Sequence, residues 1–153
     1  MMTPEEKLKS LGYELQEQKP FHPAVAMGKI TGNLLYLSGA TPTPVDGAAW
    51  DGRVGDVYTV EQGYQAARQV AFLQLQMAWN ILGDLSRIKQ TIKVLGMVNC
   101  TPGFKDTPAV MHGFSEFIYE VLGDAGVHAR SAVGVQALPG NVPVEVETIF
   151  EFE

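Results

Sequence analysis

The longest periodic segment of the chain runs from Thr59 to Gly83. Its apolar positions recur at helical spacing and are rich in alanine: Val60, Tyr64, Ala67, Ala71, Leu75, Ala78 and Leu82. Thr59 and Gln62 match a capping box, and Gly83 is a typical residue at the end of a helix. The pattern predicts a long amphipathic helix whose small side chains allow a close approach to a sheet.

Two further helices are indicated. One runs from about Thr107 to Leu122 and has a bulkier apolar stripe, made of Val110, Phe114, Phe117, Ile118, Val121 and Leu122. The other is short and follows Thr3, a good N-cap that precedes a proline and two glutamates. Gly12 is expected to end it. The polar, proline-bearing residues 16–23 then predict an extended arm.

Short apolar runs between these segments predict strands. They cover residues 25–30, 34–39 and 88–100, and the last two, 128–135 and 142–147, flank a Leu-Pro-Gly-Asn turn at 138–141. The turn and the β-branched residues around it predict a hairpin. Gly96, inside the third run, indicates either a bulge or a close approach of another element.

The resulting order is strand, strand, helix, strand, helix, strand, strand. It predicts an α+β fold in a single domain, residues 1–153, in which residues 1–23 are an N-terminal helix and arm. Both long helices are expected on one face of the sheet. Apolar side chains on the other face would need a partner, so we expect a homo-oligomer.

Composition excludes several classes of protein. Hydrophobic residues make up 46% of the 153 residues and charged residues 18%, and the net charge is −6. Acidic charge opposes binding to phosphate backbones, so no nucleic-acid partner is expected. No window approaches the ~20 apolar residues of a membrane span, and the first residues lack a basic and apolar leader, which favours a cytoplasmic protein. Cys100 is the only cysteine and is expected to be a buried structural thiol.

The predicted hairpin carries the candidate chemistry. Side chains alternate along a strand, so Arg130 and Glu145 both fall off the positions that carry valines, on the same side of the sheet. A tight turn would set them five residues apart along the strands, or ~16 Å. One small ligand cannot bridge that distance within a chain. If the two residues cooperate, they must do so across a subunit boundary, or the register must differ.

Each candidate also has a simpler interpretation. Arg130 could be the partner of one of the 17 acidic side chains, and Glu145 could be an ordinary solvated strand residue. His22, His112 and His128 are too scattered for a metal signature, so no metal site is expected. Of these, His128 lies closest to Arg130 and could line a cleft beside it, although a surface turn residue at the entrance to the hairpin is the simpler interpretation. The glycine-rich residues 47–55 lack the lysine of a phosphate-binding loop.

Several stretches together resemble the RidA (YjgF-like) family, in its longer subgroup. In chain order these stretches are residues 3–8 (TPEEKL), 32–39 (GNLLYLSG), 52–55 (GRVG), 129–131 (ARS), 138–139 (LP) and 144–147 (VEVE). The C-terminal stretches are the most specific. The match runs over nearly the whole chain in the right order.

The resemblance implies a chorismate-mutase-like fold with two helices on one face of the sheet, a homotrimer, and ligand clefts between subunits. It also implies hydrolysis, without a cofactor, of reactive enamines or imines such as 2-aminoacrylate to 2-keto acids and ammonia. Arg130 would then hold the substrate carboxylate and Glu145 would position or activate water. Main-chain groups around Ser38, Gly39 and Ala132 would line the pocket. The partners implied are a small imine, enamine or keto acid and other copies of the chain.

Three positions depart from the best-known family members. Ala132 stands where they have cysteine, and Ala40 where they have glutamine. No tyrosine aligns with their arm tyrosine at residues 21–25 (FHPAV). The alternative to a deaminase is therefore a trimer that binds small carboxylates through Arg130 without catalysis, or a purely structural trimer.

Overall fold

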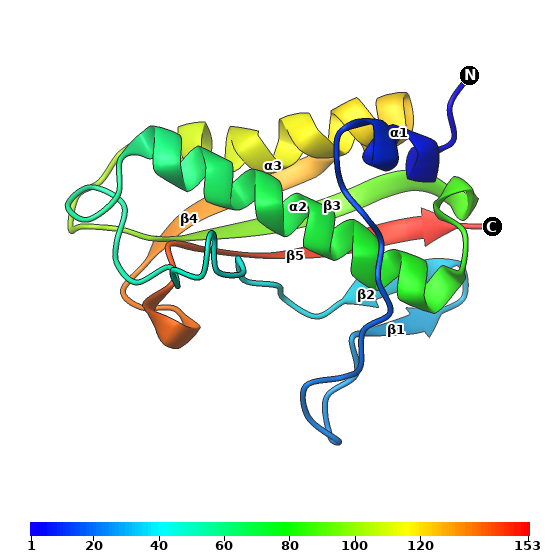
Figure 1. Cartoon of the computed structure of the whole chain (residues 1–153), viewed down its shortest axis with the longest axis horizontal. Coiled ribbons are helices and arrows are strands. Elements are labelled where there is room, and N and C mark those ends of the chain that lie inside the picture. The colour runs from blue at the N-terminus through cyan, green and yellow to red at the C-terminus, as the bar shows by residue number, and fades with distance from the viewer.

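The computed structural model describes all of residues 1–153 (Figure 1). It has three α-helices and five strands. In chain order these are α1 (Pro4–Ser10), β1 (Gly28–Thr31), β2 (Leu34–Leu37), α2 (Val60–Leu82), β3 (Ile88–Asn99), α3 (Thr107–Leu122), β4 (Ala129–Val135) and β5 (Val144–Phe152). The predicted order of elements is confirmed. None of the helices is long and apolar enough to cross a membrane.

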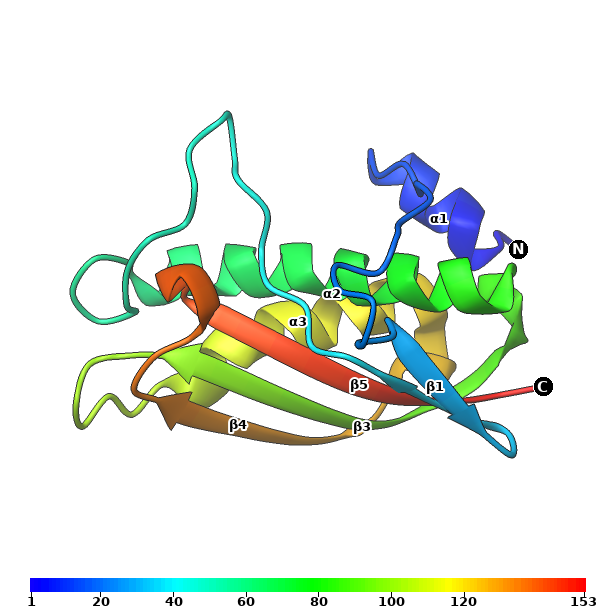
Figure 2. The same cartoon turned by 90° about the horizontal axis from the view of Figure 1, so that it is seen from below.

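The five strands form one mixed sheet in the order β1-β2-β5-β3-β4. β4 runs parallel to β3, and the other neighbours are antiparallel. Figure 2 shows the sheet in front of α2 and α3, which therefore cover the same face. This confirms the expected α+β arrangement, with the second face of the sheet free of helices.

The predicted hairpin between the last two strands is wrong. β4 and β5 are not neighbours, because β3 lies between them and bonds to both. β3, α3 and β4 form a crossover unit, which makes β4 parallel to β3 and places it at the edge of the sheet. β5 then takes the other side of β3. Residues 136–143 pass across the end of β3, where Asn99 donates to the Pro143 carbonyl at 2.9 Å.

The core lies between the sheet and the two long helices. On β5 the residues Val144, Val146, Thr148 and Phe150 are at most 1% exposed, which confirms the predicted alternation on this strand. Ala67 and Ala71 of α2 and the phenylalanines of α3 are fully buried against them. Only one face of β2 is buried, because Leu35 and Leu37 point into the core and Tyr36 points out.

The N-terminal segment is held against α2. The predicted N-cap Thr3 and the predicted capping box of Thr59 with Gln62 are both present, and Thr3 also forms a capping box with Glu6. The arm then crosses α2 (Figure 1) and is bonded to it through main-chain N–H groups. That of Gln16 donates to Gln76 Oε1 and that of Gln18 to Asn80 Oδ1, each at 2.9 Å. The arm is extended, as predicted.

Two glycines mark close contacts of α3. A side chain at Gly96 would overlap Met111 of α3, so this position is the predicted close approach, and the irregularities of β3 lie nearer its start. A side chain at Gly113 would overlap the main chain of Tyr64 on α2. The two long helices therefore meet backbone to backbone at Gly113.

We expect Gly113→Ala to destabilise the protein by about 2–3 kcal/mol, because the added methyl group overlaps main chain, which cannot move aside cheaply. Alanine is otherwise the better helix former by about 1 kcal/mol, so a loss can only come from packing. Guanidinium unfolding at one protein concentration measures the difference.

Gly63→Ala is the matched control within α2. Its added atom would lie 3.1 Å from the side chains of Val54 and Val110, which can shift. We expect a change near zero. Equal losses for the two variants would contradict a backbone contact at Gly113.

Candidate functional site

The five residues predicted to form a site fall into two places. Ser38, Gly39 and Glu145 lie together beside the end of β2, whereas Arg130 and Ala132 lie on the edge strand β4. Glu145 borders one pocket and Arg130 another, and neither pocket contains both residues.

Glu145 stands over Gly39 at one side of a pocket of about 450 Å³. The arm, α2 and the segment after β2 supply its walls, which are Gln18, Lys19, Phe21, Met27, Gly39, Ala40, Thr41, Thr43, Leu73, Met77 and Pro139. A side chain at position 39 would overlap the Glu145 carboxylate. Glycine at position 39 therefore leaves room for the Glu145 carboxylate to pack against the main chain.

The surroundings of Glu145 favour the protonated form of its carboxyl group. Burial raises the pKa of its carboxyl, and the nearby negative charge of Glu147 raises it further. Glu145 forms no ion pair. A carboxyl group whose pKa moves up toward neutrality can both accept and return protons, which is what general acid–base chemistry requires.

The main chain beside Glu145 is fixed by three hydrogen bonds. Ser38 donates from N to the Met27 carbonyl at 2.8 Å and from Oγ to the Ala26 carbonyl at 2.7 Å. The Ser38 carbonyl accepts from Nε2 of Gln74 at 3.0 Å. Gln74 is fully buried on α2. These bonds hold residues 38–39 rigidly next to the pocket.

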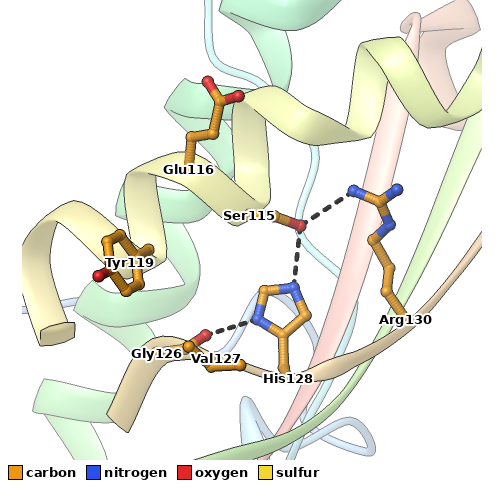
Figure 3. Close-up of a pocket in the computed structure, with 7 residues that line it drawn as sticks. All are labelled: Ser115, Glu116, Tyr119, Gly126, Val127, His128 and Arg130. Atoms are coloured by element: carbon orange, nitrogen blue, oxygen red, sulfur yellow. Dashed lines mark hydrogen bonds between the residues drawn. The ribbon is translucent and has the colours of Figure 1, made fainter. Parts of the chain in front are cut away.

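Arg130 borders the second pocket, of about 490 Å³ (Figure 3). Its guanidinium turns toward α3, where Nη1 donates to Ser115 Oγ at 3.1 Å and lies 3.1 Å from Nδ1 of His112. No carboxylate of the chain lies within ion-pair distance of it, so Arg130 forms no salt bridge within the chain. Its other N–H groups have no partner in the chain and are free for a ligand.

His128 belongs to this second site and is not the surface residue that the sequence suggested. It is half-buried, and its Nε2 lies 2.9 Å from Ser115 Oγ while Nδ1 lies 2.7 Å from the Gly126 carbonyl. Sequence reasoning missed Ser115 altogether. A usable signal existed, because residues 128 and 130 share one face of a strand and residues 112 and 115 share one face of a helix.

The expectation that Arg130 and Glu145 lie on the same side of the sheet is also wrong. Arg130 pairs with Val94, which faces the helices, whereas Glu145 pairs with Met97 on the free face. The arginine therefore points toward α3 and the glutamate away from it. Strand spacing puts their Cα atoms about 14 Å apart, two strands across and three residues along. One small ligand still cannot touch both within a chain.

Ala132 and Cys100 have limited roles in this geometry. Ala132 faces the helices, and its carbonyl accepts from Thr107 Oγ1 at 3.0 Å. Cys100 is partly exposed rather than buried, and burial of its surroundings raises the pKa of the thiol, which disfavours the reactive thiolate. No three His, Cys, Asp or Glu side chains converge as metal ligands would.

Comparison with known protein families identifies the family of this chain. The model described as "YjgF/chorismate mutase-like, putative endoribonuclease" matches residues 5–151, which is nearly the whole chain. The chain belongs to the YjgF/chorismate mutase-like family. The resemblance to the family that was found in the sequence is thereby confirmed, and so is the fold that it implied. In this YjgF-like chain the family pattern includes both strands that carry Arg130 and Glu145.

Individual relatives match most of the chain. Protein TCP17 of Trypanosoma cruzi is 38% identical over 122 residues, which are 79% of this chain and 76% of that protein. The crystal structure of Atu1372 from Agrobacterium tumefaciens, a protein described as of unknown function, is 38% identical. It superposes with a TM-score of 0.87 over 98% of this chain and 92% of its own.

Two more solved structures share the fold. A "putative endoribonuclease" from Shewanella oneidensis is 30% identical, with a TM-score of 0.90 over 99% of this chain and 100% of its own. RidA from a Psychrobacter species is 18% identical, with a TM-score of 0.60 over 92% and 97% of the two chains, and at that identity it shows the fold alone.

We expect Glu145→Gln to stabilise this YjgF-like protein at neutral pH by about 1–2 °C, a small shift because the carboxyl is half exposed. The folded state raises the pKa of Glu145 above its ordinary 4.5, so folding disfavours the charged form. The gain should therefore be present above the raised pKa and vanish below pH 4.5. Thermal unfolding from pH 4 to pH 8 measures it.

Glu17→Gln is the control, since Glu17 lies exposed on the arm. It should leave the unfolding temperature unchanged at every pH. A stabilisation by Glu145→Gln that persists at low pH would show that the carboxylate charge is not its cause.

Proposed function

We propose that this chain hydrolyses small enamines and imines that carry a carboxylate, such as 2-aminoacrylate, to 2-keto acids and ammonia. The observation that carries the proposal is the free Arg130 guanidinium, which borders a pocket without any carboxylate partner from the chain. A planar fork of N–H donors matches a carboxylate in two parallel hydrogen bonds. Membership in the YjgF-like family supports the same substrate class.

The chemistry needs one water molecule and proton transfers. The enamine takes a proton on carbon to become the imine, and water then adds to the carbon of the C=N bond. The resulting carbinolamine expels ammonia and leaves the keto acid. Glu145 is the group suited to take the proton from water and return it to the leaving nitrogen, because its raised pKa lets it do both.

The two halves of the site would meet between subunits of a homotrimer. Arg130 and Glu145 face opposite sides of the sheet in one chain. The face of the sheet without helices also carries apolar side chains that a partner could cover, namely Tyr36, Leu95, Met97, Val133 and Ile149. Tyr36 is 45% exposed and Val133 is 42% exposed. Apolar side chains that gather on one face are unfavourable in water, so this face is suited to contact another subunit.

RNA cleavage is a second candidate, favoured by the description of relatives as "putative endoribonuclease". His112 and His128 both border the Arg130–Ser115 pair, although the sequence separates them. The net charge of −6 weighs against it, because an RNA backbone needs a basic surface. The other alternative is that the chain binds small carboxylates through Arg130 without converting them, and separate assays of turnover and of binding distinguish it from the proposal.

We expect Arg130→Ala to lower kcat/KM by at least about 100-fold, the loss of two charge-assisted hydrogen bonds. Keto-acid release from enzymatically generated 2-aminoacrylate, above the rate without protein, measures it. The kcat/KM of Arg130→Lys should lie between those of the parent protein and Arg130→Ala, because lysine keeps the positive charge but lacks the planar fork of N–H donors. If the parent protein gives no acceleration but binds 2-oxobutanoate, the chain is a carboxylate-binding module and the proposal is wrong.

We expect Glu145→Gln to lower kcat by about 100-fold or more while binding of 2-oxobutanoate persists, since a proton-transfer group is lost and the anchor remains.

Chains with Arg130→Ala and with Glu145→Gln should restore activity when they are co-expressed. Random mixing leaves about a quarter of intersubunit clefts with both native residues. Mixed oligomers that stay as inactive as either variant would rule out a cleft shared between subunits.

A further inference from the structure

The pocket beside Arg130 holds a group of side chains that the proposed deamination does not use. Figure 3 shows Ser115 of α3 between His128 and Arg130. Ser115 Oγ lies 2.9 Å from Nε2 of His128 and 3.1 Å from Nη1 of Arg130. All three residues line the pocket of about 490 Å³, so the serine hydroxyl is within reach of a small molecule there.

The protons in this group can be assigned from its chemistry. The Gly126 carbonyl can only accept, so the Nδ1 atom of His128, 2.7 Å away, carries a proton and donates it. In the neutral ring Nε2 is then the acceptor and takes the hydroxyl proton of Ser115. Arg130 can only donate, so it donates to the same hydroxyl oxygen. Every bond in the chain Gly126–His128–Ser115–Arg130 thus has one donor and one acceptor.

The surroundings keep His128 in the neutral form that this assignment needs. Burial lowers its pKa, the Gly126 carbonyl bond opposes that shift, and the charge of Arg130 lowers the pKa further. Glu116 lines the same pocket, His112 contacts Arg130, and the ring of Phe114 packs edge-on against the imidazole at 6.4 Å between centroids. At neutral pH the imidazole is therefore available as a base.

We propose that Ser115 is the nucleophile of an additional hydrolytic activity toward esters with small acyl groups. The geometry has a nucleophile bonded to a base, a base oriented by the Gly126 carbonyl, and a cation 3.1 Å from the nucleophilic oxygen. Ser115 Oγ attacks the ester carbonyl carbon as its proton passes to Nε2 of His128. Arg130 stabilises the oxyanion. This activity shares Arg130 with the proposed deamination but does not depend on it.

The reaction closes without any other reagent. Collapse of the tetrahedral intermediate breaks the ester bond, and the leaving alkoxide takes the proton from His128. Water then attacks the acyl group on Ser115 and gives its proton to His128. The carboxylic acid leaves and the serine oxygen recovers its proton. The net change is ester plus water to acid plus alcohol, so atoms and electrons balance.

A fluorophosphonate probe tests the proposal, because it bonds covalently only to activated serines. We expect one adduct per chain, mapped to Ser115 by mass spectrometry of the peptides. Ser115→Ala should abolish it, and His128→Ala and His128→Gln should slow labelling by about 100-fold or more, the usual contribution of a general base. Ser131→Ala is the matched control. Ser131 lies on β4 next to Arg130, accepts a hydrogen bond from Lys93 and lies outside the pocket.

Hydrolysis of 4-nitrophenyl acetate provides a second, smaller probe, with the acetylated peptide trapped in acid. The rate should fall as pH drops through the lowered pKa of His128, because the protonated ring cannot accept the serine proton. Circular dichroism and gel filtration check that the variants are folded. No adduct on Ser115 with either probe, or equal rates for the parent and both His128 variants, would overturn the proposal. Neither assay contains an enamine, so its outcome is independent of the deaminase experiments.

Discussion

The position of β3 in the middle of the sheet determines the arrangement of everything else in this molecule. It bonds to β4 on one side and β5 on the other, and its buried face packs against α3. Because β4 follows α3, the edge strand is parallel to β3 and directs Arg130 at the helix that precedes it. β5 is antiparallel to β3 and directs Glu145 to the opposite face. One strand therefore separates the two charged groups on which the proposed function rests.

Local signals in the sequence were sufficient for the elements but not for their pairing. The capping residues Thr3 and Thr59 and the alternation on β5 are read from neighbours in the chain, and the structure confirms them. The turn at residues 138–141 is real as well, since Gly140 and Asn141 adopt positive φ angles of 62° and 58°. A turn reverses the chain, but it does not determine whether the returning strand takes the nearest edge or crosses to another. Long-range packing made that choice.

The same distinction explains the site. Arg130 and Glu145 could be predicted because charged residues on valine-rich strands stand out, and because the C-terminal stretches resemble those of a family. Ser115 was missed, because the helix face that it shares with His112 gains meaning only once the fold places His128 opposite it. Gln74 is similar: a polar residue on an amphipathic helix suggests solvent, whereas this one is fully buried and holds the Ser38 carbonyl. Both roles depend on contacts between segments that are distant in sequence.

Keeping Arg130 and Glu145 apart within a chain has a chemical consequence. If the two faced each other directly, they would form an ion pair, which would occupy the guanidinium fork and lower the pKa of the carboxyl. Instead the guanidinium is free of carboxylates, and burial with the charge of Glu147 raises the pKa of Glu145. In the intersubunit cleft that we propose, a substrate carboxylate would take the fork and leave Glu145 to handle protons. Separate half-sites thus prevent the two groups from pairing within one chain.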